Sequence, residues 1–252
     1  MFFMRLRRGA KWVFVLLVFA FAFGFLFSGV GGGGGGDVIS QLLGMRGGNP
    51  VKSAEKTVKQ HPRDASAWSS LALLYVGKGR QTDAIRAYET FLKLKPKDLV
   101  GLSQLSNIWR AITNQRWNEY SVAAQELQGA SGPFGSSTDP VQTFLGTSST
   151  NSLLTAYTSS LTTKVSDAYG VYQTAGASWE SVNRRYLKAT PVSDTLARAQ
   201  AVLQLGEAAA NANDLKTTIR SYKLYLRLVP GSKLAPQVRK ALAAAEKASP
   251  KG

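Results

Sequence analysis

The stretch Ala65–Asp98, ASAWSSLALLYVGKGRQTDAIRAYETFLKLKPKD, decides the fold. Its first half carries apolar residues at positions i, i+3, i+4 and i+7, and its second half repeats such a stripe, so each half predicts an amphipathic helix. Gly77 and Gly79 lie between the halves and favour a turn. The stretch therefore predicts a hairpin of two antiparallel helices. Its core positions are Trp68, Leu71, Ala72 and Tyr75 in the first helix, Ala84, Tyr88 and Phe91 in the second, and Pro96 after it.

A second copy of this pattern lies near the C-terminus, over Ala199–Ser232. The segment IRSYKLYLRLVP from Ile219 repeats IRAYETFLKLKP from Ile85 almost residue for residue. Its core positions are Leu205, Gly206, Tyr222, Tyr225 and Pro230. Repetition at this length predicts an array of helix hairpins, each of which buries one face against its neighbour.

The spacing W-x2-L-A-x2-Y, then G, then A-x3-Y-x2-F, then P, resembles the tetratricopeptide repeat, which has about 34 residues. The resemblance implies an α-solenoid whose first helices line a concave groove for peptides or helices of partner proteins. It places Ser66, Ser69, Leu73, Val76, Gln200, Leu203 and Glu207 at groove positions. The positions where one subset of the family grips a chaperone C-terminus with Lys, Asn and Arg are here Ser, Leu and Val, so we expect no such carboxylate clamp.

Several segments before, between and after these two repeats are also expected to be helical. Val51–Gln60 is expected to be the second helix of an incomplete leading repeat, and Leu234–Ala248 a capping helix. Another repeat begins at Leu102, and its second half, Trp117–Leu127, requires a small insertion. The Gly, Ser, Thr and Pro residues of 129–151 indicate a linker that could separate two lobes. Beyond it, Leu153–Tyr172 and Ser178–Lys188 have helical spacing, and the repeat register of 152–198 stays open.

The N-terminus predicts a membrane anchor. Four cations precede an uncharged apolar run, WVFVLLVFAFAFGFLFSGV over Trp12–Val30, which as a helix spans about 28 Å. Cations on the N-terminal side of a membrane span favour a cytoplasmic N-terminus. We therefore expect a single-pass protein of the cell membrane, with its C-terminal domain outside the cytoplasm. A cleaved signal peptide is the alternative, although the run is longer than a usual signal sequence and lacks an A-x-A ending.

Gly31–Gly36 follows this run and predicts a flexible tether, because consecutive glycines disfavour both helix and strand. Inside the apolar run, Ala20, Gly24 and Ser28 recur every four residues. Such a small-residue stripe is typical of helices that dimerise in membranes. Ordinary packing of small residues is the other interpretation, and the sequence leaves both open.

Composition limits the chemistry. The chain has 252 residues, no cysteine and one histidine, His61, which precedes Pro62 at a predicted helix end. Thiolate chemistry and a histidine-based zinc site or triad therefore lack their residues, and the scattered acids form no catalytic pair. We expect no enzymatic activity, no cofactor and no metal, with His61 acting as a helix cap.

The formal net charge is +16, with 31 Lys and Arg against 15 Asp and Glu. Lys216, Arg220, Lys223 and Arg227 recur at helical spacing and form one basic stripe. This stripe could bind anionic head groups or envelope polymers, or it could be a solvated surface. Nucleic acid is not expected as a partner outside the cytoplasm.

These features together predict an all-α, membrane-anchored bacterial protein of the tetratricopeptide type. Its expected role is a scaffold or adaptor that binds partner proteins or peptides, in envelope assembly or secretion; the alternative is a basic module for anionic polymers or lipids. The expected segments are a basic tail (1–11), a transmembrane helix (12–30), a Gly-rich tether (31–48), N-terminal repeats (49–128), a linker (129–151) and a C-terminal helical region with a repeat and a cap (152–252).

Overall fold

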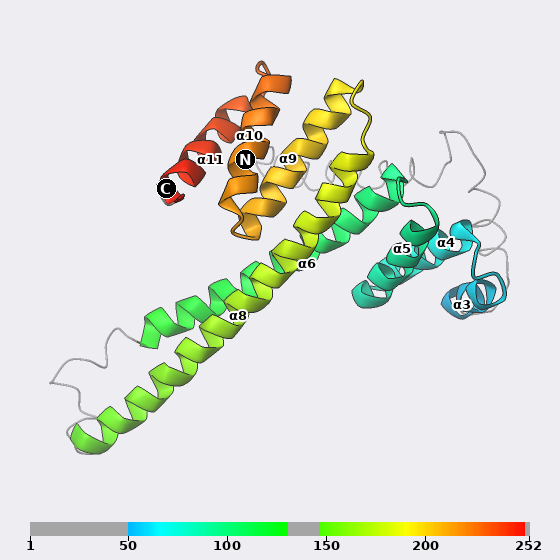
Figure 1. The fold of residues 1–252 in the computed structure, drawn as a ribbon. Helices are drawn as coiled ribbons and strands as arrows, with labels where there is room; N and C mark the ends of the chain where they lie inside the picture. The colour runs from blue at the N-terminus through cyan, green and yellow to red at the C-terminus, as the bar shows by residue number, and fades with distance from the viewer. Residues whose placement is uncertain (1–49, 131–146, 250–252) are drawn as a thin grey trace, which may run out of the picture. The chain divides into compact units, whose positions relative to one another are not determined.

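The computed structural model describes residues 50–130 and 147–249, and this part of the chain is entirely helical apart from short connections (Figure 1). The all-α prediction is therefore confirmed for these residues. The chain divides at Leu94 into two compact units. The first contains α3 (Pro50–Gln60), α4 (Ala65–Gly77) and α5 (Gln81–Leu94), and the second contains α6 (Leu99–Ala130), α8 (Thr147–Ala189), α9 (Thr195–Asn211), α10 (Leu215–Leu228) and α11 (Ala235–Ala248).

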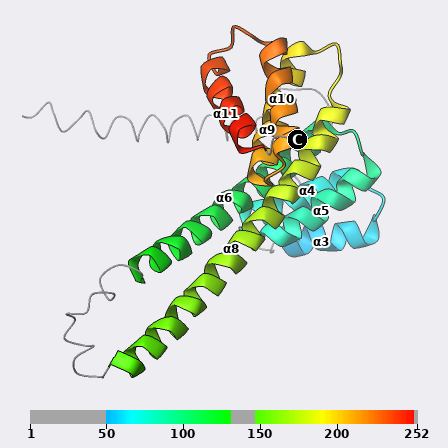
Figure 2. The same cartoon turned by 60° about the vertical axis from the view of Figure 1, so that its left-hand side comes forward.

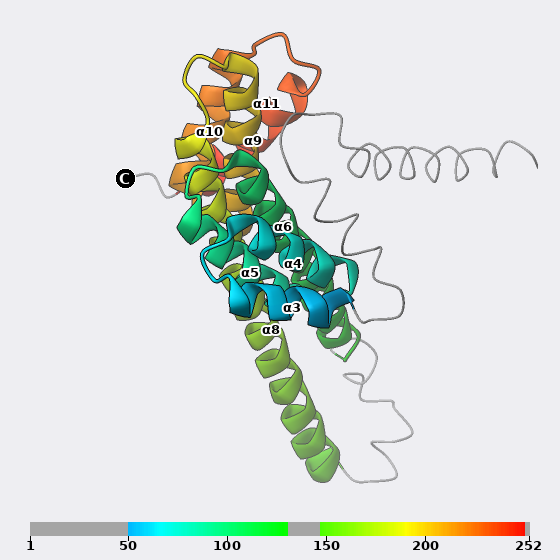
Figure 3. The same cartoon turned by 90° about the vertical axis from the view of Figure 1, so that its right-hand side faces the viewer.

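In the first unit α4 lies between α3 and α5 (Figure 3). Helix α4 begins after Asp64, whose carboxylate accepts a hydrogen bond from the Ser66 N–H at 2.8 Å and so satisfies one of the free donors of the first turn. The Tyr75 hydroxyl donates to the Glu55 carboxylate at 2.7 Å and connects α4 to α3. Ala72 and Ala84 are fully buried, as expected where two helices approach closely.

The turn between α4 and α5 depends on a glycine. Gly79 has φ +69°, a left-handed conformation that side chains with a Cβ adopt at a cost. The Arg80 N–H then reaches back to the Tyr75 carbonyl at 2.9 Å, which closes the end of α4 as a Schellman-type cap.

In the second unit α6 and α8 form a long antiparallel pair (Figures 1 and 2). Helix α9 packs against α8, α10 packs against α9, and α11 packs against α10. The C-terminal half of α6 and the N-terminal half of α8 extend beyond these three helices (Figure 1). Buried polar side chains connect the N-terminal half of α6 to the C-terminal half of α8. The Trp179 Nε1–H donates to Ser106 Oγ at 3.0 Å, and Ser106 Oγ donates to Asn183 Oδ1 at 3.1 Å.

These two helices differ from the sequence-based expectation. The repeat expected to begin at Leu102 and to turn back over Trp117–Leu127 is absent, because α6 runs unbroken for 32 residues. No Gly or Pro lies between Leu102 and Gln128, so nothing in the local sequence stops the helix. Likewise α8 is one helix of 43 residues instead of two, and its internal glycines do not end it.

Both ends of the predicted linker 129–151 are helical, and residues 131–146 lie outside the described residues. Helix α6 continues to Ala130 and α8 begins at Thr147. The first unit also ends at Leu94, so the helix that follows it belongs to the second unit, whereas the sequence grouped residues 49–128.

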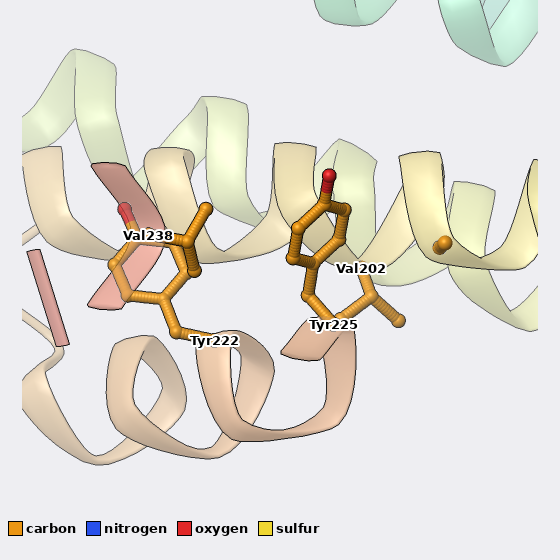
Figure 4. Packing of buried hydrophobic residues seen from close by; sticks show 5 residues of the cluster. Val202, Tyr222, Tyr225 and Val238 are labelled. Atoms are coloured by element: carbon orange, nitrogen blue, oxygen red, sulfur yellow. The ribbon is translucent and has the colours of Figure 1, made fainter. Parts of the chain in front are cut away.

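The second hairpin, α9–α10, is built around Tyr222. Its ring packs with Val202, Tyr225 and Val238 in a cluster that joins α9, α10 and α11 (Figure 4). Gly206 leaves room for that ring, since a Cβ placed there would come within 2.5 Å of a Tyr222 ring carbon. Gly206 is thus required by packing.

The start of α10 is held by a polar cluster. The Asp214 carboxylate accepts from the Thr217 N–H at 2.9 Å and caps the helix. Arg184 of α8 donates to the same carboxylate at 3.0 Å, to Thr217 Oγ1 at 2.7 Å and to the buried carboxylate of Glu180. This cluster connects α8 to α10.

The predictions for residues 1–49 lie outside the described residues. They include the basic tail, the membrane span 12–30, the glycine tether and the stripe Ala20, Gly24 and Ser28. Within the part of the chain that is described, no helix has both the length and the apolar character needed to cross a membrane.

Candidate functional site

A groove lies along α9 in the second unit. It encloses about 690 Å³ and is lined by one face of α9, by the end of α10 with the following connection, and by one residue of α6. Its apolar walls come mainly from Leu196, Leu203 and Leu234. The remaining lining residues are Arg110, Ala199, Gln200, Gln204, Glu207, Tyr225, Val229, Gly231 and Ser232.

The connection after α10 is fixed in place by hydroxyl groups. The Tyr225 and Ser232 hydroxyl oxygens lie 2.7 Å apart, and Ser232 Oγ also accepts from the Leu234 N–H at 3.2 Å. Because Tyr225 is itself buried in the core of α9–α10, the wall formed by residues 229–234 is attached to the hairpin.

One acid and one cation face each other across the groove. Burial raises the pKa of the Glu207 carboxyl, and the positive charge of Arg110 lowers it in part. Burial, with a smaller contribution from the charge of Glu207, raises the pKa of Tyr222 to about 12. Glu207 is therefore an ionisable group in a partly desolvated position, which is the setting in which a bound group of complementary charge gains most.

The candidate groove residues divide between the two units. Gln200, Leu203 and Glu207 all line the groove on α9. Ser66, Leu73 and Val76 are exposed on α4 of the first unit, and Ser69 there is half-buried.

Arg110 was not singled out by sequence reasoning, and neither were the residues after α10. Arg110 enters the site because α6 packs against α8, which in turn packs against α9. No local signal in the sequence indicates these contacts. In the connection between α10 and α11, Gly231 and Ser232 follow Pro230 and indicate a turn. This turn signal does not show which surface of the protein the turn covers.

The core positions of both repeats lie mostly between the helices of their hairpins. Leu71, Ala72, Tyr75, Ala84, Tyr88 and Phe91 are buried in the first, and Leu205, Gly206, Tyr222 and Tyr225 in the second. Trp68 is half-buried, and its Nε1–H donates to the Pro62 carbonyl at 2.9 Å. Pro96 and Pro230 are exposed beyond the second helices.

The basic stripe lies on the exposed side of α10. Lys216, Arg220, Lys223 and Arg227 are all exposed. Lys223 forms an ion pair with Glu246 of α11 at 2.8 Å, and among the described residues it is the one member of the stripe with such a partner. Three unneutralised cations therefore remain on this surface.

His61 follows the last residue of α3, and it is the backbone of His61 that closes the helix end. Its N–H donates to the Thr57 carbonyl at 2.8 Å, and its carbonyl accepts from the Asp64 N–H at 3.0 Å. In the part of the chain that the structure describes, no group of three or more His, Cys, Asp or Glu side chains is placed to hold a metal ion.

Comparison with known proteins adds no family to these observations. No protein-family model matches the chain, and no curated protein is significantly similar to it. The likeness of the two hairpins to tetratricopeptide repeats therefore rests on their own residues and geometry.

Proposed function

We propose that this chain is a binding protein of the tetratricopeptide type, with its helix hairpins arranged as a solenoid, and that the groove along α9 receives a segment of a partner protein. The observation that carries the proposal is the position of Gln200, Leu203 and Glu207, three residues at which the repeat pattern expects ligand contact, on the wall of one groove. Its volume of about 690 Å³ is within the range of about 300–1,000 Å³ that is usual for ligand sites.

The lining indicates the chemistry of the ligand. Leucine side chains on opposite walls favour an apolar side chain between them, since burial contributes about 25 cal/mol per Å² of apolar area. Gln200 and Gln204 offer amide donors and acceptors for a peptide backbone, and Glu207 with Arg110 fixes the direction of a polar neighbour. We therefore propose an apolar peptide or helix as the bound segment.

We propose no catalytic role for this groove. Its two hydroxyl groups, those of Tyr225 and Ser232, are paired with each other. Its carboxylate, that of Glu207, faces the Arg110 guanidinium across the groove, an arrangement that suits recognition of a polar group.

We further propose that the domain is held outside the cytoplasm by residues 12–30, as a scaffold in envelope assembly or secretion. The cations before Trp12 support this orientation. A reporter that is active only in the cytoplasm, fused after Gly252, should then stay inactive; a bright cytoplasmic signal would contradict the proposal.

The groove is tested by photo-crosslinking in cells that express the full chain. A photoreactive amino acid at Leu203 should give a discrete adduct, while the same amino acid at the exposed Val192, outside the groove lining, should not. Leu203→Glu should abolish an adduct formed from position 200, because a carboxylate would face apolar walls, and Val192→Glu should leave it unchanged. Equal adducts from both variants would rule out the groove as the binding site.

The alternative function, binding of an anionic polymer or lipid surface, is favoured by the three unpaired cations on α10. Heparin is a convenient polyanion for the test. Lys216→Gln, Arg220→Gln and Arg227→Gln together should lower the salt needed to elute the full chain from heparin, because fewer counterions are released. The matched control removes three exposed lysines of α3, Lys52, Lys56 and Lys59. Equal effects would show attraction by net charge alone.

A further inference from the structure

The pair formed by α6 and α8 carries a cluster of aromatic rings, none of which is among the lining residues of the groove. Four rings form a closed set, in which Trp117 contacts Tyr120 at 5.4 Å and Tyr172 at 5.3 Å between ring centroids. Tyr169 completes it, at 5.3 Å from Tyr120 and 6.1 Å from Tyr172. Trp117 is nevertheless 48% exposed and Tyr169 37% exposed, so one side of the cluster is open to solvent.

The open side belongs to a longer surface, which we name the aromatic face. On α6 it follows Trp117, Ser121 and Ala124, at i, i+4 and i+7, and on α8 it follows Thr158, Thr162 and Tyr169 at i, i+4 and i+11. This alternation of three and four residues is the spacing with which helices pack side by side in coiled coils and bundles. Each helix thus carries a second packing stripe besides the one that faces its partner.

The aromatic face has no charge. Residues 111–130 and 152–178 contain two cations, Arg116 and Lys164, and three acids, Glu119, Glu126 and Asp167. None of these charges lies on the two stripes that define the face, and Lys164 bridges to Glu126 at 2.6 Å across the pair. The rest of the chain carries the strong basic excess of a protein whose formal net charge is +16.

The serine and threonine hydroxyls of the aromatic face are already hydrogen-bonded within their own helices. Ser121 donates to the Trp117 carbonyl at 2.8 Å, Thr158 to the Leu154 carbonyl at 2.9 Å and Thr162 to the Thr158 carbonyl at 2.8 Å. These three donors therefore keep their hydrogen bonds when another surface covers the face. Burial of this face therefore costs little and gains from the exposed rings, the residue types that are enriched at the centres of protein interfaces.

From these observations we infer that the aromatic face binds a second copy of this chain, so that two α6–α8 pairs form a four-helix bundle. Two basic chains repel each other, and the aromatic face is an uncharged surface on which they can meet without that cost. The projecting part of α6, residues 111–130, is about 30 Å long, and two helices make a face about 20 Å wide. The resulting roughly 1,200 Å² over both copies is at the lower limit for a stable interface.

Because the chain contains no cysteine, single cysteines test this contact directly. Ala124→Cys lies on the aromatic face, and Val122→Cys lies two residues away on another side of α6. In membranes that contain the full chain, a short bis-maleimide should link Ala124→Cys into a product of twice the chain mass and leave Val122→Cys monomeric. Equal linking of both variants, or an adduct with a different protein, would overturn the proposal.

A second measurement avoids the aromatic rings, whose removal could unfold the pair. Ser121→Arg places a cation on the aromatic face, and Val122→Arg, the adjacent exposed position, is its matched control. Sedimentation of the full chain in detergent should show a dimer that Ser121→Arg weakens at least tenfold and Val122→Arg changes less than twofold, with unchanged circular dichroism for both. A chain that is monomeric at every concentration, or a dimer that Ser121→Arg leaves intact, would show that the aromatic face is not the interface.

Discussion

The hairpins α4–α5 and α9–α10 share a backbone turn that two different residues produce. Gly79 has φ +69° and Asn213 has φ 60°. The residue after each donates its N–H to the carbonyl five residues earlier, Arg80 to Tyr75 and Asp214 to Ala209, both at 2.9 Å. Glycine adopts this conformation freely, and asparagine is one of the few other residues that does so at a modest cost. The turn is therefore a property of the hairpin, and its sequence can vary.

The side chains packed between the two helices differ from one hairpin to the other. The first hairpin has Ala72 and Ala84 at its closest approach, and both are fully buried. At the corresponding positions the second hairpin has Gly206 and Thr218, with the Tyr222 ring against the glycine. Gly206 of α9 is smaller than Ala72 of α4, and the Tyr222 ring of α10 fills the space beside it, so the interior of the second hairpin stays closely packed.

Other corresponding positions of the two hairpins differ in chemistry as well. Where α4 exposes Leu73, α9 has the half-buried Glu207, and where α5 has Phe91, α10 has Tyr225, whose hydroxyl contacts Ser232. That hydroxyl holds one wall of the groove. The second hairpin has therefore acquired polar groups at positions where the first is apolar, and four sets of substitutions test what these differences contribute.

The largest effect is expected at the interior of the second hairpin. Gly206→Leu places atoms where the Tyr222 ring lies, and overpacking of this kind should lower the free energy of unfolding by about 3 kcal/mol. Urea unfolding followed by circular dichroism measures the change. Gly77→Ala is the control, because a Cβ at Gly77 meets nothing within 4 Å, and it should be neutral or slightly stabilising. If Gly206→Leu unfolded like the parent, the assigned packing of α9 against α10 would be wrong.

The shared turn should be the next most sensitive feature. Gly79→Ala and Asn213→Ala each force a Cβ-bearing residue into the left-handed conformation, and each should cost about 1–2 kcal/mol. Exchanges between the two hairpins, Gly79→Asn and Asn213→Gly, should cost clearly less. Hydrogen exchange of amides in α4 and α9 reports each hairpin separately, and equal losses for the alanine variants and the exchanges would show that φ does not control the turn.

Two tyrosines should respond with opposite signs. Tyr225→Phe gives the second hairpin the ring found in the first and removes the contact with Ser232, at a cost of about 1 kcal/mol. The Tyr88 hydroxyl is buried without a hydrogen-bond partner among the described atoms, and burial raises its pKa, so Tyr88→Phe should be neutral or stabilising. Urea midpoints measure both, and a loss of stability in Tyr88→Phe would indicate an unseen partner.

Both hairpins could be predicted from the sequence because their signals are local. Apolar spacing, turn residues and a terminal proline lie within each segment, and the caps Asp64 and Asp214 act within three residues. The long α6–α8 pair could not be predicted in the same way. The sequence between Leu102 and Gln128 contains no helix breaker, which favours one long helix, but the repeat pattern favours a turn in the same segment. The contact of Trp117 with Tyr172 joins residues far apart in the chain, so no local pattern indicates it.

The groove illustrates the same limit. Gln200, Leu203 and Glu207 could be placed on it because the repeat pattern assigns a face to each residue of α9. Arg110 could not, since it reaches the groove from a helix whose position depends on the packing of α6 against α8. A pattern identifies which side of a helix is exposed, and only the tertiary structure identifies what lies opposite it.

The smallest effect is expected at Glu207, the acid that replaces an exposed leucine of the first hairpin. Its pKa is raised by burial, so its protonated form is favoured in the folded state. The contribution of the Glu207 carboxyl to the free energy of unfolding is fully present below its unfolded-state pKa and is lost as pH rises through its raised folded-state pKa. At neutral pH the ionised carboxylate therefore lowers the stability of the fold. Glu207→Gln should therefore raise stability at pH 7 by a few tenths of a kcal/mol and have no effect in acid, where the carboxyl is neutral in both states.

Arg110→Gln should act in the opposite direction, because Arg110 lowers the pKa of Glu207, and it should move the carboxyl titration seen by NMR to higher pH. If Arg110→Gln left that titration unchanged, the two side chains would not face each other across the groove, and the polar pair proposed to orient a bound peptide would not exist.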